Sequence, residues 1–182
     1  MKQDVLMESV EVPEGCSASF TDFQIMIKGP KGAISTKLTT PRIQVKIENN
    51  HVVLRSEKPS KREKRMINTY KAHVKNMFKG VTEEHTYKLK VCSGHFPMTV
   101  AYKNNILEVK NFLGEKVPRS VKLNEAVNVQ IQGDIITITS VNKETAGNAA
   151  SAIEKITRRN GFDKRVFQDG IYLTEKDGKT VA

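Results

Sequence analysis

The stretch Ile43-Gln-Val-Lys-Ile47, followed by Glu48-Asn-Asn-His51 and Val52-Val-Leu54, decides the fold. Its first five residues alternate apolar and polar side chains, which is typical of a β-strand with one buried face. The Asn pair then predicts a tight turn, because hairpin turns often need a positive φ that Asn tolerates. The apolar run after the turn completes an expected antiparallel hairpin.

The same pattern occurs once more in the second half of the chain, at nearly the same offset before the turn and after it. The second copy is Val127-Asn-Val-Gln-Ile131, then Gln132-Gly-Asp134, then Ile135-Ile-Thr-Ile138. Self-similarity at a fixed offset is the mark of a duplicated structural unit. The chain is therefore predicted to contain two copies of one unit.

Further strands are predicted upstream of both hairpins, at residues 24–28 and 106–110. A glycine follows each of these strands closely: Gly32 follows Ile27-Lys28, and Gly114 follows Val109-Lys110. The offset between these two sets of residues is close to the offset between the hairpins. The segment Gly29-Pro-Lys-Gly32 predicts a turn between strands.

One helix is predicted after each hairpin, over about 60–79 and about 143–159. Apolar residues recur there at helical spacing and should form the buried stripes. These residues are Met66, Ile67, Tyr70, Val74, Met77 and Phe78 in the first helix, and Ala146, Ala149, Ile153 and Ile156 in the second. Pro59 suits the first turn of the first helix and Gly80 suits its stop. Asn142 suits the cap of the second helix, which Gly161 follows.

These elements predict an α+β fold made of two tandem duplicated domains, each a small antiparallel β-sheet packed with one α-helix. We expect an N-terminal domain over residues 1–82 and a C-terminal domain over residues 83–182. Residues 162–182 mix basic, aromatic and turn residues and are too few for a third domain. Two interpretations of this tail stay open: an ordered part of the second domain, or an extension that orders on a partner.

The charge balance indicates a polyanionic partner. The chain has 30 Lys and Arg against 20 Asp and Glu, a net charge of +10, and a pI near 9.6. Basic groups that neutralise phosphates release condensed counterions, which favours nucleic-acid binding. Charge alone does not distinguish RNA, DNA and an acidic membrane surface.

Membrane insertion and export are not expected. The chain has no apolar run long enough to span a bilayer, and acidic residues interrupt the first dozen positions, unlike a signal peptide. Cys16 and Cys92 are far apart without paired spacing, which favours a reducing, cytoplasmic location.

No constellation for catalysis is found, so no catalytic residue and no cofactor is predicted. Cys92-Ser-Gly-His95 has ligand-like spacing, but a structural zinc site needs four ligands and no second pair completes this one. No metal site is predicted. Cys92 is expected as a core residue at the end of a strand, and His95 in packing or hydrogen bonding. An enzyme with an unrecognised site remains a minor alternative.

Basic residues beside aromatic ones mark the candidate RNA-binding segments. Lys and Arg suit phosphates, Asn suits base edges and aromatic rings stack on unpaired bases. The first segment, expected as an exposed loop, contributes Lys110, Asn111, Phe112, Gly114, Lys116 and Arg119. The end of the second helix and the tail contribute Arg158, Arg159, Asn160, Lys164, Arg165, Phe167 and Tyr172. The alternative for each aromatic residue of the tail is packing against its own domain.

Six stretches, in order along nearly the whole chain, resemble one known family. They are Ile27-Lys-Gly-Pro-Lys-Gly-Ala33, Ala72-His-Val-Lys-Asn-Met-Phe-Lys-Gly-Val81, Tyr87-Lys-Leu-Lys90, His95-Phe-Pro-Met-Thr-Val100, Asn111-Phe-Leu-Gly-Glu-Lys116 and Phe167-Gln-Asp-Gly-Ile-Tyr172. The sequence is similar to the L-six family of large-subunit ribosomal proteins in its archaeal and eukaryotic form. Ser93-Gly94, where the family usually has Tyr-Ala, and Asn148, where it often has Gln, are modest departures.

The resemblance implies a structural rRNA-binding protein of the cytoplasmic ribosome rather than an enzyme. It implies two tandem α+β domains, with large-subunit rRNA bound mainly by the second near the stalk base and the sarcin–ricin loop. Neighbouring ribosomal proteins of the stalk base would then be partners, with translation GTPases nearby. A translation factor that visits ribosomes and leaves is the other hypothesis.

Overall fold

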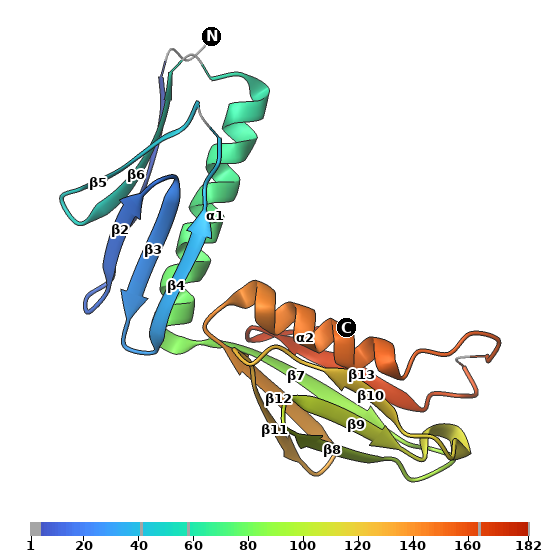
Figure 1. Ribbon diagram of the computed structural model, residues 1–182. Helices are drawn as coiled ribbons and strands as arrows, with labels where there is room; N and C mark the ends of the chain where they lie inside the picture. Colours follow the sequence, from blue (N-terminus) through green and yellow to red (C-terminus); the bar gives the residue numbers. More distant parts are fainter. Residues whose placement is uncertain (1–4, 41, 58, 164, 182) are drawn as a thin grey trace. The chain divides into compact units, whose positions relative to one another are not determined.

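The computed structural model describes residues 5–40, 42–57, 59–163 and 165–181. The chain divides into two compact units, residues 1–84 and 85–182. Each is a mixture of antiparallel sheets and one α-helix, so the predicted α+β class is confirmed (Figure 1).

The described residues of the first unit form six strands followed by a long helix. Its elements are β1 (Val5–Glu11), β2 (Ser17–Thr21), β3 (Gln24–Gly29), β4 (Gly32–Lys37), β5 (Gln44–Glu48), β6 (His51–Glu57) and α1 (Lys61–Glu83). They form two three-stranded sheets, in the orders β1-β6-β5 and β2-β3-β4, instead of the single sheet expected. The helix packs on strands of both sheets, which explains why two sheets share one core.

The predicted hairpin at 43–54 is confirmed as β5 and β6. Glu48 pairs with His51 around the turn, and both Asn49 and Asn50 have positive φ angles of 47° and 62°. The alternation places Val45, Val52 and Leu54 in the core, while Lys46 and Glu48 are exposed. The turn at Gly29-Pro-Lys-Gly32 is also confirmed, between β3 and β4.

Helix α1 begins as expected but runs past its expected end. Ser60 caps it through a reciprocal capping box with Glu63. Gly80 does not stop the helix, which continues to Glu83 and ends at Glu84 with φ of 62°. Tertiary packing explains the correction: Val81 is fully buried, and its carbonyl oxygen accepts the backbone N–H of Lys31 at 2.9 Å.

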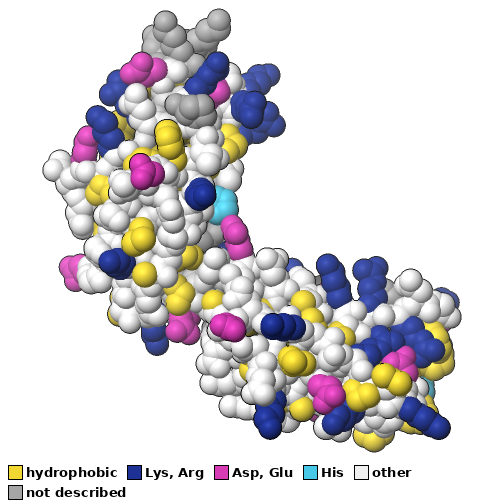
Figure 2. Space-filling model, viewed as in Figure 1, with side chains coloured by type: hydrophobic (Ala, Val, Ile, Leu, Met, Phe, Trp, Pro, Cys, Tyr) yellow, Lys and Arg dark blue, Asp and Glu magenta, His cyan; other side chains and the backbone are white. Residues whose placement is uncertain are grey.

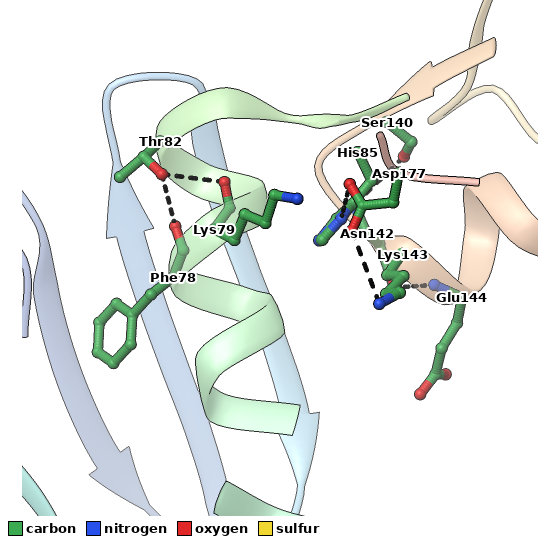
Figure 3. Close-up of polar contacts among 9 residues, drawn as sticks. All are labelled: Phe78, Lys79, Thr82, His85, Ser140, Asn142, Lys143, Glu144 and Asp177. Atoms are coloured by element: carbon green, nitrogen blue, oxygen red, sulfur yellow. Dashed lines mark hydrogen bonds and ion pairs between the residues drawn. The ribbon is translucent and has the colours of Figure 1, made fainter. Parts of the chain in front are cut away.

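The last turn of α1 carries an additional side-chain bond. The Thr82 hydroxyl donates to the carbonyl oxygens of Phe78 and Lys79, at 3.1 and 3.0 Å (Figure 3). Both carbonyl groups lie inside the helix, so the Thr82 hydroxyl finds its acceptors within its own helix rather than in solvent.

Over the part that the structure describes, the second unit forms eight strands, a short 3-10 turn and one helix. Its elements are β7 (His85–Cys92), β8 (Thr99–Lys103), β9 (Ile106–Lys110), η1 (Phe112–Gly114), β10 (Arg119–Lys122), β11 (Asn128–Gln132), β12 (Ile135–Ser140), α2 (Lys143–Ile156), β13 (Gly170–Lys176) and β14 (Lys179–Thr180). A three-stranded sheet has the order β10-β9-β8, and a five-stranded sheet has the order β11-β12-β7-β13-β14.

The helix α2 lies against the five-stranded sheet and contacts β7, β12 and β13 (Figure 1). Asn142 caps it by accepting the backbone N–H of Glu144 at 2.9 Å, as predicted. Ala146, Ala149 and Ala150 are buried, and these small side chains let the helix approach the sheet closely. The helix ends at Ile156, short of the predicted end near Arg159.

Residues 170–180 belong to the second unit as an ordered hairpin. Strand β13 pairs antiparallel with β7, and β14 pairs with β13. Of the two interpretations of the tail, the ordered one therefore holds for these residues. The strand was not predicted, because its burial depends on β7, which lies far earlier in the chain.

Polar contacts fasten this hairpin to the start of the second unit (Figure 3). The fully buried His85 has its Nδ1 3.1 Å from Asp177 Oδ1, and Lys143 Nζ lies 3.7 Å from Asp177 Oδ2. One carboxylate in the β13–β14 turn thus contacts the first residues of both β7 and α2.

Candidate nucleic-acid interface

Several of the predicted RNA-binding residues lie where α2 ends in the second unit. Thr157 at this end joins helix and sheet: its Oγ1 accepts the backbone N–H of Ile171 at 3.0 Å and donates to the carbonyl oxygen of Glu154 at 3.2 Å. Arg158 and Arg159 follow directly and are exposed. The bond to β13 therefore fixes where the two arginines leave the helix.

Arg119, at the start of β10, binds groups of its own chain. Its Nε and Nη2 donate to the two carboxylate oxygens of Glu115, both at 2.7 Å. Its Nη1 donates to the carbonyl oxygens of Ile156, at 2.7 Å, and Arg158, at 3.4 Å. The hydrogen bonds from Arg119, with the charges of Arg119 and Arg159, hold the pKa of Glu115 below its ordinary value despite partial burial. Arg119 thus anchors the end of α2, a role that the sequence analysis missed.

Phe112 does not offer its ring for base stacking. It is 2% exposed, lies in the core of the second unit and carries the Arg119 guanidinium 4.5 Å from its ring centre. The expectation of an exposed aromatic residue at this position is corrected. The segment 110–119 curls through η1 and turns this ring inward.

Four side chains contact one another in series beside the end of α2. The Arg159 guanidinium lies 4.2 Å from the centre of the Phe162 ring. Phe162 meets Phe167 edge to face, and Phe167 stacks on His95, with centre distances of 4.9 Å in both pairs. Offset-stacked and edge-to-face geometries are the favoured arrangements of such rings. We call this series, Arg159–Phe162–Phe167–His95, the aromatic ladder.

Asp169 fixes the His95 end of the aromatic ladder. Its carboxylate is buried and accepts the backbone N–H groups of Gly94, at 2.7 Å, and His95, at 3.0 Å, while His95 Nδ1 lies 2.5 Å away. Burial would raise the pKa of Asp169, but the hydrogen bonds from His95 and Gly94 outweigh it and lower that pKa. The expected role of His95 in packing and hydrogen bonding is confirmed. Asp169 was not predicted; only its place in the quoted family stretch pointed to it.

A pocket of about 320 Å³ opens beside the aromatic ladder. Its lining combines apolar, aromatic and basic side chains from η1, α2, the segment after α2 and β13. The lining residues are Phe112, Leu113, Ser151, Glu154, Lys155, Thr157, Arg158, Arg159, Phe162, Phe167, Asp169, Ile171 and Tyr172. Figure 2 shows basic and hydrophobic side chains gathered where the second unit's helix ends.

The cations at this pocket differ in their pairing. Arg159 lies 3.7 Å from Glu115, whereas no carboxylate in the described part of the chain pairs with Arg158 or Lys155. Tyr172 is 41% and Phe162 37% exposed, so both offer surface to a ligand. Burial, with nearby Cys92, Asp169 and Glu154, raises the pKa of Tyr172, so its hydroxyl is protonated at neutral pH.

Other predicted residues lie outside the pocket lining. Lys110 is exposed, 3.3 Å from Glu108, and the Asn111 amide donates to the carbonyl oxygen of Pro97 at 3.0 Å. Gly114 has φ of 77° and lies under the Phe96 ring, where a Cβ would be 3.6 Å from it.

The remaining predicted residues are exposed or not described. Lys116 and Asn160 are exposed, and Arg165 pairs with Asp163 at 2.8 Å. This pair lowers the pKa of Asp163 and raises that of Arg165. Lys164 lies outside the described residues.

The described residues form neither a metal site nor a membrane-spanning helix. No group of three or more His, Cys, Asp or Glu side chains is placed there to hold a metal ion. Neither α1 nor α2 has the length and apolar character of a membrane-spanning segment there. Cys92 lies at the end of β7, as expected, but it is half-buried and not in the core.

The fold and this site define a basic α+β protein of two units whose second unit gathers arginines and aromatic rings around one pocket. A family model described as ribosomal protein L6 matches residues 12–84. The large ribosomal subunit protein uL6 of Methanococcus vannielii is 40% identical over 177 residues, covering 97% of each chain. The uL6 protein of Methanobrevibacter smithii is 41% identical over 172 residues, covering 94% of this chain and 97% of its own. That of Methanothrix thermoacetophila is 38% identical over 171 residues, with the same coverage.

This chain belongs to the uL6 family of large-ribosomal-subunit proteins, in agreement with the resemblance seen in its sequence. The matched relatives are named as ribosomal proteins and not as enzymes.

Proposed function

We propose that this chain is a structural constituent of the large ribosomal subunit in the cytoplasm and that its C-terminal domain binds large-subunit rRNA. The end of α2 carries the proposal: Arg158 and Lys155 extend from a pocket with exposed rings and have no carboxylate partner among the described residues. A cation without a protein counter-charge is available to neutralise phosphate.

The proposed RNA contacts differ according to whether a side chain is already paired within the protein. Arg158, Lys155, Lys116 and Asn160 are exposed and suit the sugar–phosphate backbone, which supplies most of the affinity. Arg159 and Arg165 are each paired with a carboxylate of the protein. They would therefore contribute less than a full contact to the RNA phosphates. Arg119 stabilises this surface without contacting RNA itself, because its N–H donors bind groups of the protein.

The family resemblance supplies the location. We propose binding near the base of the lateral stalk and the sarcin–ricin region, beside other ribosomal proteins and the docking site of translation GTPases. A rigid, basic protein there would hold rRNA in the shape that supports factor binding. Specificity would come from RNA shape and from bases in loops, because side chains do not reach into the deep major groove of paired RNA.

A salt-titrated filter-binding assay with large-subunit rRNA tests this proposal. The double variant Arg158→Ala/Lys155→Ala should bind more weakly, and its log–log salt slope should fall by about 0.7 to 0.9 per lost phosphate contact. The control Lys103→Ala/Lys122→Ala removes the same charge from exposed positions at the opposite end of the β10-β9-β8 sheet. Equal affinities for the two double variants would refute the assignment.

Gradient fractionation of native lysate tests whether the chain is a permanent component of the ribosome. The chain should stay on large subunits in stoichiometric amount after a high-salt wash. Release into light fractions would instead identify a visiting factor.

A further inference from the structure

The pocket at the end of α2 combines two features that a nucleotide requires. Phe112 and Leu113 from η1 and Ile171 from β13 give its lining an apolar part. The partly exposed rings of Phe162 and Tyr172 also line it. Its volume of about 320 Å³ is at the small end of the range for ligand sites, which suits one planar group rather than an extended chain.

The charges around the pocket favour an anion. Lys155, Arg158 and Arg159 all line it. Of its two carboxylates, Asp169 is buried and occupied by Gly94 and His95, which leaves Glu154 as the exposed one. The Tyr172 hydroxyl and Ser151 add polar groups that can meet base edges or a ribose.

The aromatic ladder holds one stacking surface in a fixed position. The Arg159 guanidinium lies 4.2 Å from the centre of the Phe162 ring, and Phe162 meets Phe167 edge to face. Phe167 is stacked in turn on His95, which Asp169 holds. A ring that is positioned before binding loses little side-chain entropy when a base stacks on it. RNA-binding proteins use such rings to hold bases that have left a helix.

We infer that this pocket receives one unpaired nucleotide of the bound RNA, with its base stacked on Phe162 and its phosphates against Arg158 and Lys155. The inference deepens the proposed function and rests on it. It adds that the second unit reads one extruded base, whereas the proposed function requires only contact with the RNA backbone.

Salt-dependent binding separates stacking from phosphate contact. Stacking releases no counterions, so Phe162→Leu should lower the affinity for large-subunit rRNA by about 5- to 100-fold, as expected for loss of one base–aromatic stack, with an unchanged salt slope. Phe162→Tyr keeps a ring and should restore most of the affinity. Arg158→Ala should lower both the affinity and the slope.

Circular dichroism melting shows whether each variant is folded, which matters because Phe162 also contacts Arg159 and Phe167. Ultraviolet crosslinking of the wild-type complex supplies a direct measurement. The peptide that contains Phe162 should carry a single nucleotide at one unpaired rRNA position.

The outcomes separate the inference from the proposed function. Unchanged rRNA affinity of a folded Phe162→Leu variant, together with weakened binding by Arg158→Ala, would overturn the nucleotide pocket and leave rRNA binding in place. Failure of the wild-type chain to prefer large-subunit rRNA over an unrelated RNA would overturn both. If Phe162→Leu weakens binding of a neighbouring ribosomal protein but not of rRNA, the pocket is a protein site and the inference is wrong.

Discussion

Arg119 holds both carboxylate oxygens of Glu115 at 2.7 Å while its third nitrogen reaches the carbonyl oxygen of Ile156, the last residue of α2. One side chain therefore links the segment after η1, the start of β10 and the end of the helix. The pocket and the aromatic ladder lie at this junction, so its rigidity sets the geometry of the proposed RNA surface.

Replacing Arg119 should destabilise the second unit. Hydrogen bonds to charged, partly buried groups contribute about 1.5 to 3 kcal/mol each, and both partners are about one-quarter exposed, so we expect Arg119→Ala to lower the free energy of unfolding by about 1 to 3 kcal/mol in urea denaturation. Arg165→Ala is the matched control, because its pair with Asp163 is exposed and should contribute little. Equal losses for both variants would contradict the anchoring role of Arg119.

Phe112 should act chiefly on stability. The buried ring fills the core, so Phe112→Ala should lower the free energy of unfolding by about 3 to 5 kcal/mol. Phe96→Ala, at a ring that is about half exposed, should cost much less in the same denaturation assay. A small effect of Phe112→Ala would show that the ring is not part of the core.

Asp169 should make stability depend on pH in the acid range. Its pKa in the folded state lies below the ordinary value of 3.8, so the ionised carboxylate stabilises the fold above that value. This contribution is lost as the pH falls through the lower folded-state pKa. The free energy of unfolding should therefore fall less steeply with acid in Asp169→Asn than in the wild type, from about pH 5 to pH 2. Asp134→Asn, at an exposed turn residue, is the control; parallel curves for wild type and Asp169→Asn would rule out the contribution.

Gly29 should tolerate no side chain. A Cβ there would lie 2.7 Å from Val81 Cγ2 and 3.0 Å from the Val81 carbonyl oxygen, closer than real contacts allow. Gly29→Ala should thus force β3 and α1 apart and lower the free energy of unfolding by about 1 to 3 kcal/mol, as overpacking does. Gly94→Ala has open space around the new methyl group and should be close to neutral. Thermal melting of both variants decides the point.

The local elements could be predicted because their causes are local. The alternation at 43–47 and 127–131, the Asn turn and the cap at Asn142 each act between near neighbours, and the structure places the elements close to their predicted bounds at the hairpins. The duplicated order of strands and helix, the basic charge and the family resemblance were equally visible in the chain. These features established the fold class and the kind of partner to expect.

Only the tertiary structure decided which predicted side chains remain available. Phe112 and Arg119 have the same composition cues as Phe162 and Arg158, but η1 and the end of α2 direct the first pair inward and leave the second pair exposed. Gly80 stays helical because Val81 packs under Gly29, and β13 forms because β7 offers it an edge. The sequence by itself determined the two hairpins, the start of each helix and the charge, since these depend on neighbouring residues. Burial and pairing were decided by residues far apart in the chain, because those contacts exist only once the core has closed.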